Sequence, residues 1–383
     1  MSTDKINVLI IVKSVDGGQG TFLNDLSKIN SGPSTRQINI KIVALERPSY
    51  RKLEIPNIKF MRPKKFYPQK YSLSPINFIN LLHELIWIRK EAKIFNPDIV
   101  MGIDLRCNLL AIASKVLFLG NFKTIAETHI DLTSLTLNVS KGWAKNFLKI
   151  FIRFFYERAD KLVSVSKKLS LHLRQDFNIK RAVQTIYNGK DFKTGRVKPF
   201  PSSQRRIFLS IGRLSQQKDY QSLINTMELL SEDYENYELW IAGDGPEKQN
   251  LIKLVKRFHL EDKVKLLGWV KDVGRLFDKS HIFVLSSKSE GLPYVLLEAM
   301  SHGLPVVSTD APHGPFEILE GGKYGLLVPV DNKKLLKNAI LKLATNKSLF
   351  DYFSKQSLKR SRFFSEEKML NEYRKIFIKL TSK

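Results

Sequence analysis

Short apolar runs alternate with longer helical stretches along the whole chain, and this alternation restricts the fold more than any other feature. The runs in the first half are INVLIIVKS, INIKIVAL, DIVMGID, KTIAETHI and KLVSVS, and those in the second half are RIFLSIG, YELWIAG, KVKLLGW, HIFVLSS and PVVSTD. Continuous apolar runs separated by helices are typical of parallel strands that are buried on both faces. The sequence therefore predicts an α/β protein built from two doubly wound, Rossmann-like halves.

The length of the chain also favours two domains, because 383 residues exceed what one ordinary core encloses. A basic and polar stretch at 189–203 contains Pro199 and Pro201 and is typical of a linker. We expect one domain at 1–195, a second at 196–360, and a terminal helix at 361–383. Ligands of such sheets lie beyond the carboxyl ends of the strands, which predicts a cleft between the two halves.

Two acidic residues, Glu290 and Glu298, bracket a turn that opens an apolar helix in SEGLPYVLLEAMSHGLPVVSTD. Gly291 and Leu292 lie in the turn, where free N–H groups at a helix N-terminus can face an anion. Pro293 suits the first helical turn, where its missing N–H would be unpaired anyway. Eight helical residues advance about 12 Å, so the carboxylates would contact different parts of one ligand, such as two rings joined by a diphosphate. The alternative is that Glu298 is a solvated helix residue and that Glu290 only interacts with the positive end of the helix dipole.

Two basic residues, Arg213 and Lys218, lie in the segment SIGRLSQQKDYQSLI. A guanidinium offers a planar fork and an ammonium offers a point charge, and both suit the oxygens of a diphosphate. Positive charge placed in advance also stabilises a phosphate leaving group as its bond to the sugar breaks. An ordinary solvated pair on the surface is the alternative.

These segments together resemble the donor site of retaining GT-B glycosyltransferases, specifically glycosyltransferase family 4. IAGDGPE, LLGWVKDV and TIYNGKDF extend the resemblance over most of the second half of the chain, in the order found in the family. The resemblance implies two facing Rossmann-like domains of the GT-B type, with the terminal helix crossing back onto the first. It also implies transfer of a sugar with retention of its anomeric configuration, by attack from the face of the leaving group.

The resemblance assigns roles in the second half by position. Arg213 and Lys218 would hold the donor diphosphate, Glu298 the ribose hydroxyls, and the backbone near Val270 the base, while Glu290 would lie beside the transferred sugar. No cofactor and no metal ion would be required. The seven histidines are scattered and Cys107 is the single cysteine, so no metal-ligand spacing contradicts this expectation.

Two features of the first half point to the same chemistry. The glycine-rich turn at 17–20 lets the backbone approach a phosphate or sugar, and we expect a helix from Thr21. A tight turn alone is the alternative, but the resemblance makes Gly18 a contact to donor or acceptor. His129 ends a predicted strand, where an imidazole can donate a hydrogen bond to a hydroxyl or carry a proton. A lone histidine there is often only a satisfied polar residue, and the resemblance favours the contact to sugar.

Positive charge is concentrated in the first half of the chain. The net charge is +26, and residues 1–200 hold 34 of the 63 basic side chains but only 15 of the 37 acidic ones. The segment KGWAKNFLKIFIRFFYERADK predicts a helix with a basic stripe beside a wide apolar face. Such a helix fits an anionic membrane interface, and an ordinary domain helix is the alternative. The membrane face would comprise Lys141, Lys145, Lys149, Arg153 and Trp143, and the basic, aromatic loop at Arg62–Tyr71 would extend it.

The expected function is therefore transfer of a hexose or N-acetylhexosamine from a nucleotide sugar, with uridine favoured as the base, to a lipid-linked saccharide. The short apolar run at the N-terminus is not typical of a signal peptide, and no apolar run is long enough to span a bilayer. We thus expect a cytoplasmic protein at the inner face of the membrane. A basic nucleic-acid-binding protein is an alternative, but no reader motif is present and nucleic acid is not expected as a partner. A phosphorylase or a sugar-nucleotide sensor on the same fold is a further alternative.

Overall fold

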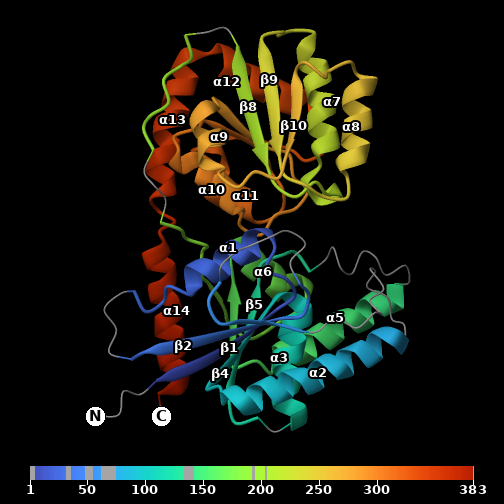
Figure 1. Cartoon of the computed structure of the whole chain (residues 1–383), viewed down its shortest axis with the longest axis vertical. Helices are drawn as coiled ribbons and strands as arrows, with labels where there is room; N and C mark the ends of the chain where they lie inside the picture. Colours follow the sequence, from blue (N-terminus) through green and yellow to red (C-terminus); the bar gives the residue numbers. More distant parts are fainter. Residues whose placement is uncertain are drawn as a thin grey trace. The chain divides into compact units, whose positions relative to one another are not determined.

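The computed structural model describes residues 5–31, 36–47, 55–61, 75–118, 120–132, 142–191, 195–202 and 205–382. The chain forms two compact units, one made of Met1–Asn188 with Glu366–Lys383 and the other of Gly189–Ser365 (Figure 1). The second unit thus begins at Gly189 and not at residue 196. The terminal segment that belongs to the first unit begins at Glu366 and not at residue 361.

The first unit is a parallel sheet with the strand order β3-β2-β1-β4-β5-β6-β7. Its strands are β1 (Ile6–Val12), β2 (Ile38–Ala44), β3 (Ile58–Phe60), β4 (Ile99–Ile103), β5 (Lys123–Thr128), β6 (Lys161–Ser164) and β7 (Val183–Thr185). Its helices are α1 (Gly17–Leu26), α2 (Pro75–Phe95), α3 (Asp104–Phe118), α5 (Gly142–Tyr156), α6 (Lys167–Asp176) and α14 (Glu366–Thr381).

The second unit is a parallel sheet with the strand order β10-β9-β8-β11-β12-β13. Its strands are β8 (Arg206–Ile211), β9 (Tyr237–Ala242), β10 (Val264–Gly268), β11 (Ile282–Leu285), β12 (Val306–Thr309) and β13 (Leu326–Val328). Its helices are η1 (Gln216–Lys218), α7 (Tyr220–Ser231), α8 (Lys248–Arg257), α9 (Gly274–Lys279), α10 (Tyr294–Ser301), α11 (Gly314–Leu319), η2 (Glu320–Gly322), α12 (Lys333–Thr345) and α13 (Lys347–Ser361).

The apolar runs of the sequence form strands of the two sheets, as predicted, and one of them, β10, lies at a sheet edge. All residues of β4 and β11 are buried, which is why these strands carry continuous rather than alternating apolar residues. The structure adds three short strands, β3, β7 and β13, which no apolar run in the sequence indicates. It also begins α1 at Gly17, four residues before the predicted start at Thr21.

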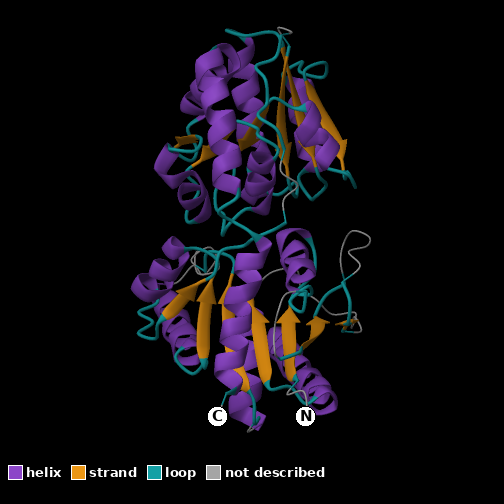
Figure 2. Ribbon diagram, turned by 90° about the vertical axis from the view of Figure 1, so that its left-hand side faces the viewer, coloured by secondary structure: helices purple, strands orange, loops and turns teal. Residues whose placement is uncertain are grey.

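The terminal helix α14 lies across one face of the first sheet, which Figure 2 shows. Its buried side chains include Met369, Leu370 and Phe377, which contribute to the core of that unit. The Arg374 Nε donates a hydrogen bond of 2.6 Å to the Ile29 carbonyl oxygen, at the end of the segment that follows α1. The chain therefore returns to the first unit with its last helix.

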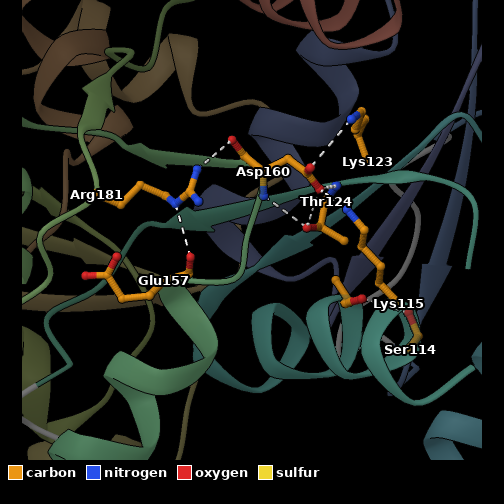
Figure 3. A network of polar contacts seen from close by, with 8 residues as sticks. Ser114, Lys115, Lys123, Thr124, Glu157, Asp160 and Arg181 are labelled. Atoms are coloured by element: carbon orange, nitrogen blue, oxygen red, sulfur yellow. Dashed lines mark hydrogen bonds and ion pairs between the residues drawn. The ribbon is translucent and has the colours of Figure 1, made fainter. Parts of the chain in front are cut away.

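A polar network around Asp160 holds the amino ends of β5 and β6 together (Figure 3). The Asp160 carboxylate accepts hydrogen bonds from the Thr124 amide at 2.7 Å and from Lys115 Nζ at 2.6 Å. Burial opposes the charge of Asp160, but Lys115 and Thr124 outweigh it and hold the pKa of Asp160 below its ordinary value. Arg181 donates to the carbonyl oxygens of Glu157 and Asp160. The amino edge of these strands is therefore stabilised by internal contacts.

Candidate functional site

The second sheet has a topological switch point between β8 and β11, because the chain runs from β8 through β9 to β10 on one side and then returns to β11 on the other. Ligands of doubly wound sheets bind beyond the carboxyl ends of the strands at such a point. Arg213 and Lys218 follow β8, and Glu290 follows β11. The topology therefore brings the predicted basic and acidic residues to one edge of one sheet.

Lys218 and Glu290 form an ion pair at this switch point. The Lys218 Nζ lies 2.6 Å from Glu290 Oε1, and the Ser287 hydroxyl donates to the same oxygen at 2.6 Å. Glu290 is only 7% exposed, and these two donors satisfy the hydrogen-bonding need of a carboxylate buried there. An ammonium has three N–H donors, and the contact with Glu290 uses one of them.

Glu298 has a lysine partner of its own. The Lys190 Nζ lies within hydrogen-bond distance of Glu298 Oε1, and the side chain of Glu298 is partly exposed on α10. Lys190 is in the segment TIYNGKDF, which the sequence analysis quoted without assigning a role to this residue. The contact joins positions 108 residues apart, so no local pattern could have indicated it.

Glycines bring the loops after β8 and β9 into direct backbone contact. The Leu214 amide donates to the Asp244 carbonyl oxygen at 2.9 Å, and the Glu247 amide donates to the Leu214 carbonyl oxygen at 3.0 Å. A Cβ atom at Gly243 would lie 1.9 Å from the Gly212 carbonyl oxygen, and one at Gly245 would lie 2.3 Å from that of Leu214. These contacts fix the shape of the loop that carries Arg213.

The other residues predicted for the donor lie around the same edge. Arg213 is exposed, and Val270 is half-buried just after β10, two strands from β8. Gly291 and Leu292 are buried and precede α10. Pro293 is the N-cap of α10, with φ −69° and ψ 112°, and not a residue of its first turn as expected. The Glu290 backbone also forms an isolated parallel bridge with His313, which the sequence analysis left without a role.

The first sheet has a second switch point, between β1 and β4, and a polar contact crosses it. Gln19 in α1 donates to Asp104, which follows β4 and has a positive φ of 65°. Gly18 is exposed in the first turn of α1, and the side chain of the N-cap residue Asp16 makes no capping hydrogen bond. The first turn of α1 thus lies at the carboxyl edge, and a contact of Gly18 with phosphate or sugar stays a prediction.

His129 lies at the same edge, directly after β5, and belongs to a buried polar network. Its Nε2 lies 2.7 Å from Glu127 Oε1, and its amide donates to Asp104 Oδ1 at 3.0 Å. Tyr373 of α14 donates to Glu127 Oε1 at 2.5 Å. Burial disfavours a charged imidazole, but Glu127 and Asp104 outweigh it and raise the pKa of His129 above its ordinary value. The imidazole of His129 is thus oriented by Glu127 and its backbone is held by Asp104, and sequence reasoning missed both carboxylates.

The helix α5 divides its apolar residues between the core and the solvent. Leu148 and Phe155 pack against the core, whereas Phe147 and Ile150 are 62% and 66% exposed. Phe151 and Phe154 are also exposed, and the spacing places these four residues on one helix face. The basic stripe of Lys145, Lys149 and Arg153 lies on another face, and Lys149 Nζ is 5.8 Å from the Phe177 ring centre. Lys141, the side chain of Trp143 and the loop 62–71 lie outside the described residues.

The described residues show neither a metal cluster nor a membrane-spanning helix. No group of three His, Cys, Asp or Glu side chains there could hold a metal ion. Within the same ranges, no helix has the length and apolar content needed to cross a bilayer.

Two family models match the chain, and together they cover both units. The model described as Glycosyltransferase Family 4 matches residues 17–193, and the model described as Glycosyl transferases group 1 matches residues 191–360. The fold is that of the GT-B glycosyltransferases. The chain belongs to the group 1 glycosyltransferases of family 4.

Relatives from several organisms extend this result. The chain is 27% identical over 344 residues to an uncharacterized glycosyltransferase of Methanocaldococcus jannaschii, covering 79% of this chain and 84% of the relative. It is 28% identical over 291 residues to a Campylobacter jejuni enzyme named as an N-acetylgalactosaminyltransferase acting on a diphospho-undecaprenol-linked saccharide, covering 72% and 79%. The chain is thus related to enzymes of lipid-linked and polysaccharide assembly.

Solved structures share the fold at low identity. Sucrose-phosphate synthase from Thermosynechococcus elongatus has a TM-score of 0.79 at 17% identity, with 98% of this chain and 99% of that chain covered. The Anabaena protein HepE, solved in complex with UDP-glucose, has a TM-score of 0.75 at 17% identity, with 97% and 99% covered. At these identities the likeness describes the fold.

Proposed function

We propose that this glycosyltransferase moves a hexose or an N-acetylhexosamine from a uridine diphosphate sugar to a hydroxyl of a lipid-linked saccharide, with retention of configuration and without a metal ion. The observation that carries this proposal is the Lys218–Glu290 pair at the switch point of the second sheet. It sets a cation and a carboxylate side by side where a phosphate and a sugar would meet. The related enzymes of lipid-linked and polysaccharide assembly support the kind of acceptor.

The proposed electrostatics rest on two cations. Lys218 keeps N–H donors beyond its contact with Glu290, and Arg213 is exposed in the loop that the glycines hold in place. Both would contact non-bridging oxygens of the diphosphate, which gains charge as the glycosidic bond breaks. UDP and UDP-glucose bound to HepE support uridine as the base in the proposal.

The proposed chemical step keeps the acceptor on the side of the leaving group. The bond from the anomeric carbon to the phosphate oxygen breaks, the acceptor oxygen bonds to the same carbon, and a departing phosphate oxygen takes the proton of the acceptor. Glu290 would hold the transferred sugar, and His129 would donate a hydrogen bond to one of its hydroxyls. In a retaining glycosidase, by contrast, two carboxyl groups about 5 Å apart flank the bond, with one as the nucleophile.

The experiment is transfer with a panel of nucleotide sugars and a lipid-linked acceptor, in buffer with a chelator. We expect a uridine donor to be used and the product to carry the anomer of the donor, as read from the proton NMR coupling of the anomeric position. An inverted product would contradict retention. Turnover that stops with chelator and returns with manganese would contradict metal independence.

The exposed face of α5 is proposed to bind an anionic membrane, which would bring the enzyme to its acceptor at the inner face of the cytoplasmic membrane. Phe147, Ile150, Phe151 and Phe154 form an exposed apolar face on a helix that also carries Lys145, Lys149 and Arg153. Apolar side chains that enter the acyl boundary are typical of interfacial helices, and the positive charge of the same helix adds attraction to anionic lipid.

Sedimentation with vesicles that contain anionic phospholipid tests this surface. Each buried aromatic side chain contributes about 1.5 kcal/mol or more to the free energy of membrane binding. The double variant Phe147→Ser with Phe154→Ser should therefore bind vesicles over tenfold more weakly. Leu335→Ser is the matched control, because Leu335 is exposed on α12 of the other unit. Equal sedimentation of the double variant and the control would contradict the proposed surface.

A further inference from the structure

The backbone of Lys190 is held by a hydrogen bond within the second unit, and its side chain contacts Glu298. The Lys190 amide donates a hydrogen bond of 3.2 Å to the Phe364 carbonyl oxygen, and the side chain then reaches Glu298 Oε1 on α10. Both partners are partly buried, with side-chain exposures of 33% for Lys190 and 19% for Glu298. A contact at this depth is screened less by salt and water than an ion pair on the open surface.

The chain after Lys190 packs along the end of the same helix. The Gly195 amide donates to the Ser301 carbonyl oxygen at 2.8 Å, and a Cβ atom at Gly195 would lie 2.7 Å from the Cα of His302. A Cβ atom at Gly303 would lie 2.3 Å from the Arg196 carbonyl oxygen. The backbone is therefore held at Lys190 by Phe364 and, after residue 194, by the end of α10.

We propose that Lys190 is a positioning residue for the donor, which orients the Glu298 carboxylate toward the ribose. The inference rests on the proposed function, in which Glu298 accepts hydrogen bonds from the two ribose hydroxyls. A carboxylate has two oxygens and about four acceptor positions. The ammonium occupies Oε1, so Glu298 has a fixed orientation and Oε2 is directed to the ligand. Without Lys190, the side chain of Glu298 would rotate freely and lose entropy on binding.

The experiment measures nucleotide affinity by calorimetry with two probes, UDP and its 2′,3′-dideoxy analogue, which lacks both ribose hydroxyls. Wild-type protein should bind UDP at least tenfold more tightly than the analogue. Lys190→Gln should lower the affinity for UDP about tenfold and leave the affinity for the analogue unchanged. Lys190→Arg should retain most of the preference for UDP over the analogue. Arg196→Gln removes one positive charge from the same segment and should behave as wild type, because Arg196 is exposed.

A double variant provides the second measurement. If Lys190 acts through Glu298, then Lys190→Gln combined with Glu298→Gln should bind UDP no more weakly than Glu298→Gln alone. If Lys190→Gln lowered the affinities for UDP and for the analogue equally, the inference would be overturned, because Lys190 would then act at the phosphates or in folding. A wild type that binds UDP without preference over the analogue would also overturn it and leave the proposed function standing. Failure of the wild type to bind any nucleoside diphosphate would overturn both.

Discussion

The Lys218 ammonium lies 2.6 Å from Glu290 Oε1, at the edge where β8 and β11 end side by side. This contact pairs the cation proposed for the diphosphate with the carboxylate proposed for the transferred sugar. It gives the nearly buried Glu290 carboxylate a positively charged partner. It also means that removing either partner leaves the other buried without its counter-charge.

Replacement of Lys218 by methionine should reduce donor affinity and turnover together. The variant removes one cation from the diphosphate and leaves Glu290 without its ammonium partner. We expect kcat to fall by about 10²- to 10³-fold, as for other donors that stabilise developing charge. Steady-state kinetics with the preferred nucleotide sugar measure this effect. Lys253→Met, at an exposed position of α8, should keep wild-type rates, and a similar loss there would point to net charge as the cause.

Replacement of Arg213 by lysine should weaken the phosphate contact selectively. The charge is kept, but the planar fork that binds two oxygens at once is lost. We expect UDP to bind about tenfold more weakly, which corresponds to about 1.4 kcal/mol, while uridine alone binds as before. Calorimetry with both ligands checks this. An equal loss of affinity for uridine would show that Arg213 does not act at the phosphates.

Much of the fold was predictable from the sequence, because buried parallel strands require apolar runs that are visible in one dimension. The strands β3, β7 and β13 were missed because each has only three residues. The start of α1 was placed too late, because glycine has low intrinsic helix propensity and Gly17 to Gly20 masked the first turn.

The candidate site was predictable only in part. Lys218 and Glu290 were each indicated by motifs, whereas the contact between them joins residues 72 positions apart. Lys190 with Glu298, and Tyr373 with Glu127, are separated by 108 and 246 positions. These pairs depend on how distant helices and strands pack together, and no local spacing in the sequence indicates that.

Substitution of Gly245 by alanine should disturb the loop that carries Arg213. The new Cβ atom would lie 2.3 Å from the Leu214 carbonyl oxygen, so the two loop backbones would have to separate. We expect a loss of roughly 1–3 kcal/mol in the free energy of unfolding, measured by urea denaturation, with weaker donor binding. Gly142→Ala is the control, because nothing lies within 4 Å of its Cβ position. Unchanged stability of Gly245→Ala would contradict the close approach of the loops.

His281 should make the protein sensitive to mild acid. Burial, with repulsion from Arg206 and Lys198, lowers the pKa of His281 to about 4, and its Nδ1 accepts the Ile207 amide at 2.8 Å. The unfolded chain therefore binds more protons than the folded one between pH 4 and the ordinary value of 6.5. The resulting stability is complete above pH 6.5 and is lost as the pH falls toward 4.

Urea denaturation at several pH values tests this assignment. The free energy of unfolding should decline less steeply with acid in His281→Gln than in wild type, although the variant is less stable near neutral pH. His259→Asn, at an exposed position, is expected to keep the wild-type slope. Equal slopes in His281→Gln and wild type would show that other groups cause the acid sensitivity.

Replacement of Tyr373 by phenylalanine should destabilise the first unit. The hydroxyl donates to Glu127 Oε1 at 2.5 Å, and Glu127 is fully buried. Loss of a hydrogen bond to a buried carboxylate costs about 1.5–3 kcal/mol. Urea denaturation should show that loss, whereas Tyr352→Phe, at an exposed position of α13, should change little. A Tyr373→Phe variant as stable as wild type would argue against a stabilising contact between this hydroxyl and Glu127.

The central claim is that two cations of the second unit hold the donor diphosphate directly. A crystal structure of the protein with UDP, grown in the presence of a chelator, tests it most directly. The account predicts phosphate oxygens about 2.7–2.9 Å from Lys218 Nζ and from the Arg213 guanidinium nitrogens. A diphosphate bound elsewhere, or one that binds only through a metal ion when the chelator is omitted, would contradict the account.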